Sequence, residues 1–241
     1  MYNTGEIVVL PYASCTKEVY AIFTDEDHAM KRFLSGVAAI CTVFACACLA
    51  APEPAIVPAP GQWTVNVDFT HPQQILLPRT LDGRPNRFWY TIITLTNNTG
   101  SDVDFYPRCD LMTDNFQIIA AGKFVSPTVF EQIKQRHTAR YPFIERLDRA
   151  GNRMLEGEDN AKDIAVIWPD FDAKAKNIKI FITGLSNETA VVPHPVSKDA
   201  AGEPVKLFLR KTLELSYGLR SDATLRSDAS LVFKGKRWIM R

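Results

Sequence analysis

The chain has 241 residues, of which 46% are hydrophobic and 23% are charged, and its formal net charge is +1. This composition is typical of a globular protein and excludes a disordered chain, a collagen-like repeat and a protein with many membrane-spanning helices. The near-zero net charge gives no electrostatic basis for nucleic acid as a partner.

An export signal is the first recognisable feature of the chain, and it does not begin at Met1. Met30 is followed by two cations, Lys31 and Arg32, and then by an uncharged stretch that ends in small residues. This order is the layout of a secretory signal peptide, which we place at residues 30–50. We interpret residues 1–29 as an extension from a mis-assigned start. The alternative is a cytoplasmic extension before a signal anchor, because the apolar stretch is long enough to span a membrane.

Two fates of the signal segment follow from its small residues and cysteines. Cleavage near Ala50 would release a soluble domain, whereas Val43–Cys46 is similar to a bacterial lipobox, although Phe44 departs from that pattern. Cys46 is therefore the candidate lipidation site. Cleavage after Ala50 leaves Cys109 as the one cysteine of the remaining chain. The exported domain would then have no internal disulfide and would depend on its hydrophobic core for stability.

A proline-rich segment follows the signal, with four prolines between residues 51 and 61. Proline fixes φ and removes a backbone donor, so this segment is expected to be a stiff, extended tether. The folded domain is expected at residues 62–241.

Alternating apolar and polar residues predict strands through most of this domain. Residues 63–69 alternate with period two, and residues 88–96 carry apolar side chains on both faces, as in a central strand. The turn-forming residues 97–101 then predict a hairpin to a strand at 103–105. Further strands are expected at residues 116–120, 164–168, 178–183, 205–217 and 237–240.

Two local features interrupt this pattern of strands. Lys211 falls on the apolar parity of residues 205–217, so a bulge or strand break is expected there. Ser126 and Pro127 are suited to the start of a helix, and the apolar stripe after them predicts one short inserted helix.

These elements predict an all-β fold, an antiparallel β-sandwich with one short inserted helix. The course of strand, Asn-Asn-Thr-Gly turn and strand between Arg87 and Pro107 resembles the early hairpin of immunoglobulin-like domains in an uncharacterised family of exported bacterial proteins. The resemblance implies an immunoglobulin-like architecture and no particular activity.

Two groups of residues are candidates for ligand binding. Hard oxygen ligands suit calcium, so the acidic residues near position 160 are a weak calcium candidate, with solvated loop charge as the alternative. Exposed aromatic rings can bind sugars, and two tryptophans are candidates for such a platform, with core packing as the alternative. These residues are Glu156, Glu158, Asp159 and Asp163 for the metal, and Trp168 and Trp238 for the platform.

No catalytic constellation is recognisable, and neither an enzyme nor a cofactor is expected. The sequence favours an exported, non-catalytic module with a structural or protein-interaction role in the cell envelope or the extracellular space. Its partner would be an unknown protein or envelope component, and it would contact the membrane only through the signal segment or a lipid anchor. The alternatives are a carbohydrate- or small-ligand-binding sandwich and an exported hydrolase. The hydrolase would need a pocket in which His137 or His194 meets a carboxylate, Ser186 or Cys109.

Overall fold

The computed structural model describes residues 52–78, 86–220 and 229–241, which belong to one compact unit of the chain. The predicted extension at 1–29, the signal peptide at 30–50 and Cys46 lie outside the described residues. In the part of the chain that is described, no helix has the length and apolar character needed to cross a membrane.

The first sheet is built around β3 (Asn86–Asn97), the predicted central strand. On one side, β1 (Asn66–Phe69) and β2 (Gln73–Leu77) pair with successive parts of β3, and on the other side β9 (Gly157–Pro169) pairs along its length. These pairings are antiparallel, whereas the short β7 (Glu145–Arg146) joins β9 in parallel. The side chains of β3 are buried on both faces, as its apolar pattern predicted, because they contribute alternately to two hydrophobic clusters, one on each side of the sheet.

The second sheet is built around β12 (Pro204–Arg220). Its second half lies between β13 (Ser230–Met240) and β10 (Asn177–Thr183), and its first half pairs with β11 (Thr189–Lys198). The remaining strands, all antiparallel to their neighbours, are β5 (Arg108–Thr113) and β6 (Ile118–Ala120) at the other edge, and β4 (Val103–Asp104) with β8 (Arg153–Met154) in a separate small pair.

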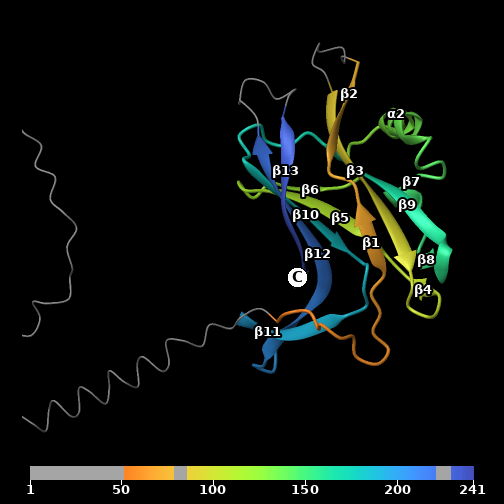
Figure 1. The fold of residues 1–241 in the computed structure, drawn as a ribbon. Helices are drawn as coiled ribbons and strands as arrows, with labels where there is room; N and C mark the ends of the chain where they lie inside the picture. The colour runs from red at the N-terminus through yellow and green to blue at the C-terminus, as the bar shows by residue number, and fades with distance from the viewer. Residues whose placement is uncertain (1–51, 79–85, 221–228) are drawn as a thin grey trace, which may run out of the picture. The chain divides into compact units, whose positions relative to one another are not determined.

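Figure 1 shows the strands of the two sheets. Buried side chains from both sheets form one hydrophobic cluster. Trp89 and Trp168 come from the first sheet, and Ile180, Leu213 and Leu215 come from the second. Alternation explains this arrangement, since every second residue of a strand points to the same face. The all-β prediction is therefore confirmed, with antiparallel sheets as the main elements of the fold.

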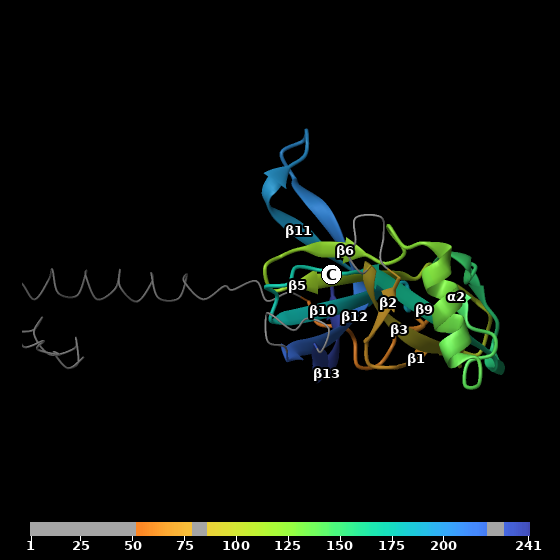
Figure 2. The same ribbon diagram turned by 90° about the horizontal axis from the view of Figure 1, so that it is seen from above.

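The predicted helix is α2 (Pro127–His137), and it covers the other face of the first sheet (Figure 2). Val129 and Ile133 are fully buried and belong to a second cluster with Tyr90, Ile92 and Ile167. Ser126 has the extended backbone of an N-cap, but its side chain makes no capping hydrogen bond. A single 3-10 turn, η1 (Leu147–Arg149), follows between β7 and β8.

Two predictions made from the sequence are wrong, namely the hairpin after β3 and the bulge or break at Lys211. β3 does not form a hairpin with the strand at 103–104, because β9 occupies the edge of β3 and β4 pairs with β8 instead. The bulge or break expected at Lys211 is also absent, since β12 runs through this residue as one strand. Its partner changes there from β11 to β10 and β13, and the lysine is compensated by an ion pair described below.

Candidate functional site

The four carboxylates proposed for calcium do not come together. Glu156 accepts a hydrogen bond from the Gly100 amide (3.0 Å), and Asp163 accepts one from the Thr94 hydroxyl (2.6 Å). Glu158 and Asp159 are exposed neighbours in β9, and successive side chains of a strand point to opposite faces. Within the described residues, no group of three or more potential metal ligands is found.

Of the two tryptophans proposed for an aromatic platform, only Trp238 is partly exposed. Trp168 is fully buried between the sheets, because the whole stretch from Ile164 to Trp168 is a central part of β9 with both faces covered. Trp238 is half-buried, and its ring centroid lies 5.5 Å from Nζ of Lys211. Trp168 is therefore a core residue, and Trp238 packs at the base of the site described below.

The residues considered for hydrolysis are also separate. Burial raises the pKa of the Cys109 thiol far above its ordinary value, with the charge of Asp110 acting in the same direction. Ser186 donates a hydrogen bond to the Trp63 carbonyl (2.8 Å). Among the interactions of the described residues, none pairs His137 or His194 with a carboxylate, Ser186 or Cys109: His137 contacts the Tyr90 hydroxyl, and Nδ1 of His194 accepts hydrogen bonds from nearby backbone amides.

A two-stranded ribbon extends from the second sheet and is the most distinctive surface feature of the described residues (Figure 2). It consists of β11 and residues 204–210 of β12, with Thr189 opposite Arg210 and Pro193 opposite Lys206. No third strand of the described chain pairs with either of its edges. We refer to residues 189–210 as the ribbon.

Apolar side chains lie on both faces of the ribbon. One face carries Ala190 opposite Leu209 and Val192 opposite Leu207, all half-buried. The other face carries the cross-strand pair Val191 and Phe208, which are 53% and 68% exposed.

A ribbon with this composition lacks the cover that normally stabilises paired strands. Two strands alone are marginally stable in water, and a hydrophobic face usually requires a further layer. The exposed apolar surface is therefore a feature that the fold of the described residues leaves without a structural use.

The base of the ribbon is held by a buried ion pair. Nζ of Lys211 lies 2.8 Å from Oε2 of Glu188, and the backbone amide of Ala55 donates to Oε1 of the same carboxylate (2.7 Å). Burial by itself would raise the pKa of Glu188, but the hydrogen bonds from Lys211 and Ala55 and the charge of Lys211 outweigh it and hold the pKa below its ordinary value. Glu188 is therefore ionised at neutral pH and links the tether to β12.

A hollow of about 750 Å³ lies beside this ion pair. It is formed where the tether approaches the second sheet, with Pro52–Ile56 on one side and Lys211, Trp238 and Met240 on the other. The proline-rich tether thus packs against the described domain through a few contacts at the base of the ribbon.

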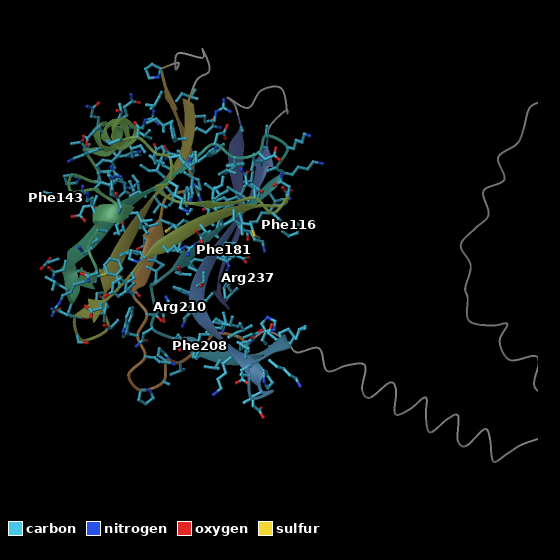
Figure 3. The ribbon with its side chains drawn as sticks, turned by 180° about the vertical axis from the view of Figure 1, so that it is seen from behind. Phe116, Phe143, Phe181, Phe208, Arg210 and Arg237 are labelled. Carbon is cyan, nitrogen blue, oxygen red and sulfur yellow. The ribbon has the colours of Figure 1, made fainter. Side chains whose placement is uncertain are left out.

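Cations surround the exposed face of the ribbon. Lys206 and Arg210 flank Phe208 along β12, and both are exposed. Figure 3 shows Phe208 and Arg210 with Arg237 and Phe181 farther along the same sheet. Arg237 is already paired with Glu214 (3.0 Å), and the guanidinium of Arg241 lies 4.1 Å from the ring centroid of Phe181. Lys206 and Arg210 make no ion pair with a carboxylate of the described chain.

β11 was not among the strands predicted from the sequence, and neither was the pairing of Val191 with Phe208. The segment contains Pro193 and Pro195, and proline is excluded from the interior of sheets. Proline is tolerated on an edge strand, and in the structure the residues from Thr189 to Pro195 alternate between exposed and half-buried, as in a strand.

Comparison of the chain with protein-family models, with curated protein sequences and with solved structures finds no match.

Proposed function

We propose that the protein is an exported, non-catalytic, immunoglobulin-like β-sandwich module that binds a partner protein through its ribbon. Two mainly antiparallel sheets with one shared core support the sandwich architecture. Export to the cell envelope or the extracellular space rests on the signal segment at residues 30–50.

The observation that carries the binding role is the cross-strand pair Val191 and Phe208, exposed on a ribbon that stands apart from the core. Fully burying a side chain of this kind stabilises an assembly by about 1.5–3 kcal/mol relative to leaving it in water. In the isolated chain this stabilisation is only partly realised, since Val191 and Phe208 are 53% and 68% exposed. A partner that covers the pair would gain it, and an aromatic anchor near the centre of a patch is typical of protein interfaces.

The test is a comparison of three proteins purified from the native host. These are the natural chain, the ribbon variant Val191→Ser/Phe208→Ser, and the control Phe143→Ser. Phe143 is 86% exposed and lies away from the ribbon (Figure 3), so the control removes a comparable exposed ring elsewhere. Co-purifying proteins are cross-linked in intact cells and quantified by mass spectrometry.

We expect at least one protein to be recovered with the natural chain and with Phe143→Ser, and to be depleted about tenfold with the ribbon variant. Circular dichroism of the three purified proteins must show the same β-rich spectrum. Equal recovery of every co-purifying protein with all three would contradict a binding role for the ribbon.

A further inference from the structure

Another hollow, of about 240 Å³, lies beside β9 where the short β7 ends. Ala165 and Ile167 of β9 form part of its wall, and Phe130 of α2 packs on the same face of the sheet. The turn after β6 closes another side through Ala121 and Gly122. Folded proteins contain few voids larger than a water molecule, so an apolar hollow of this size indicates room for a ligand.

The main chain of β9 directs a hydrogen-bond donor toward this hollow. The Ile167 carbonyl accepts a hydrogen bond from the amide of Gly122 (2.8 Å), on the side of β9 that faces away from β3. The N–H and C=O groups of one residue in an antiparallel strand face the same way, so the Ile167 amide also points away from β3. The pairing of β9 with β7 ends at Ala165, opposite Arg146, and does not extend to Ile167.

This donor has no partner within the described chain. No hydrogen bond of the described residues reaches the Ile167 amide, although the residue is only 5% exposed. Buried amides without a partner are rare, because the hydrogen bond to water that is lost on folding is normally replaced by another. A ligand oxygen in the hollow would supply the replacement.

Two guanidinium groups that line the hollow add further donors. Arg108 donates to the Asp110 carboxylate through Nε (3.2 Å), and its two terminal nitrogens make no hydrogen bond with the described residues. Arg146 donates to Asp148 through Nε and one terminal nitrogen (both 2.8 Å), which leaves its other terminal nitrogen without a partner among the same residues. Guanidinium groups bind carboxylates through shorter and stronger hydrogen bonds than they form with neutral acceptors.

The volume of the hollow sets the size of its ligand. A protein cavity of about 150 Å³ holds benzene. A hollow of about 240 Å³ therefore has room for one such ring with a small polar group attached, whereas a larger ring system would not fit. The apolar lining from Val125, Phe130 and Leu147 suits the ring, and the donors described above suit an acceptor with a negative charge.

We propose that this hollow binds a small aromatic carboxylic acid as its anion, of about the size of benzoate. The ring packs against Ala165 and Ile167, and the carboxylate accepts hydrogen bonds from the Ile167 amide and the terminal nitrogens of Arg108. An amine of the same size would place a cation among donors and beside two guanidinium groups, so the site rejects it. The hollow shares no residue with the ribbon, and its ligand is independent of the partner proposed above.

The probes are benzoate, benzamide and benzylamine, which share one ring and differ in charge, and acetate, which has the carboxylate without the ring. Each is titrated into the isotope-labelled full chain, and the amide signal of Ile167 is followed by NMR. We expect benzoate to shift this signal and to bind with a Kd of about 1 mM, and benzamide to bind roughly tenfold more weakly. Acetate and benzylamine should leave the signal in place.

Two pairs of variants test the wall and the charge. Ala165→Leu fills the hollow, and Ala161→Leu makes the same exchange at an exposed position of the same strand. Arg108→Gln removes a charge from the hollow, and Arg149→Gln removes an exposed charge outside it. We expect benzoate affinity to fall about tenfold or more in Ala165→Leu and several-fold in Arg108→Gln, and to be unchanged in both controls. Arg108→Gln should bind benzamide as the natural chain does.

The proposal is overturned if benzoate at about 10 mM does not shift the Ile167 signal, if benzylamine binds as well as benzoate, or if Ala165→Leu keeps its benzoate affinity. Equal binding of benzoate and benzamide, with no effect of Arg108→Gln, would overturn the carboxylate as the recognised group. If Ala165→Leu fails to fold, the four probes and the Ile167 signal decide on the natural chain alone. The ribbon variant Val191→Ser/Phe208→Ser should bind benzoate normally, so the two proposals fail or stand separately.

Discussion

Nζ of Lys211 lies 2.8 Å from Oε2 of Glu188, and both side chains are 8% exposed. Lys211 is the residue at which β12 changes its partners, and Glu188 lies just before β11 begins. The ion pair therefore joins the two strands of the ribbon at the point where they leave the sheet. Its position suggests that it fixes the direction of the ribbon as well as compensating a buried lysine.

Glu188→Gln should destabilise the domain by about 3 kcal/mol, because it leaves the Lys211 ammonium buried without a counter-charge. The glutamine can still accept the hydrogen bond from Ala55, so the loss would reflect the charge. The measurement is the free energy of unfolding in urea at neutral pH. As the control, Glu188→Leu combined with Lys211→Met removes both charges and should be clearly more stable than Glu188→Gln. If the single variant were as stable as the natural chain, the ion pair would have no structural role.

Acid should weaken the same interaction. The folded-state pKa of Glu188 lies below its ordinary value of 4.5, and so does that of Glu214, where burial is outweighed by the hydrogen bond from Arg237 and the charge of Lys179. A carboxylate with a lowered pKa stabilises the fold fully above the unfolded-state value, and this stabilisation is lost as the pH falls through the folded-state value.

The difference in unfolding free energy between the natural chain and Glu188→Gln should therefore be constant from about pH 7 down to about pH 5, and shrink below it. Urea titrations at a series of pH values measure this difference. A difference that grew on acidification would have the wrong sign for an ionised Glu188.

Gly184 should tolerate no side chain. Its φ is +84°, and a Cβ at this position would lie 2.1 Å from the carbonyl oxygen of Tyr106. Gly100 has a similar φ of +88° with no atom within 4 Å of such a Cβ, so it is a matched control for backbone strain alone. We expect Gly100→Ala to cost about 1 kcal/mol and Gly184→Ala at least about 2 kcal/mol more, in chemical unfolding. Equal losses would mean that the contact with Tyr106 can relax.

Cys109 should be chemically silent in the folded protein. Its side chain is buried in the cluster between the sheets, and burial keeps the thiol protonated by raising its pKa, whereas thiolate is the reactive form. Iodoacetamide should therefore modify Cys109 only after denaturation, as read by mass spectrometry of the peptide that contains it. Rapid modification of the native protein would contradict this burial. Cys109→Ala should leave partner binding unchanged.

Local patterns predicted most of the strands well. Alternation placed β10, the second half of β12 and the end of β13, and the run of apolar residues on both parities identified β3 as a central strand. The α2 helix was recognisable from Pro127 and the apolar stripe that follows it. These predictions succeeded because period and turn chemistry are properties of a few consecutive residues.

Predictions that depended on distant residues were less successful. The hairpin after β3 failed because β9, about seventy residues later in the chain, pairs with β3 in its place. The exposure expected for Trp168 failed because the second sheet covers one face of β9 and α2 packs toward the other. The carboxylates near residue 160 are close in sequence, but an extended backbone separates their side chains.

By itself, the sequence determined the β-rich composition of the domain, its short helix and the position of a candidate export signal, because these follow from side-chain period, capping residues and the order of charge and apolar residues. Only the tertiary structure decided that residues 189–210 form a two-stranded ribbon with Val191 and Phe208 exposed on one face. Which strands become neighbours depends on how the whole set of apolar faces is buried together. The exposure of Phe208 and the pairing of Glu188 with Lys211 are consequences of that packing, and no local pattern contains them.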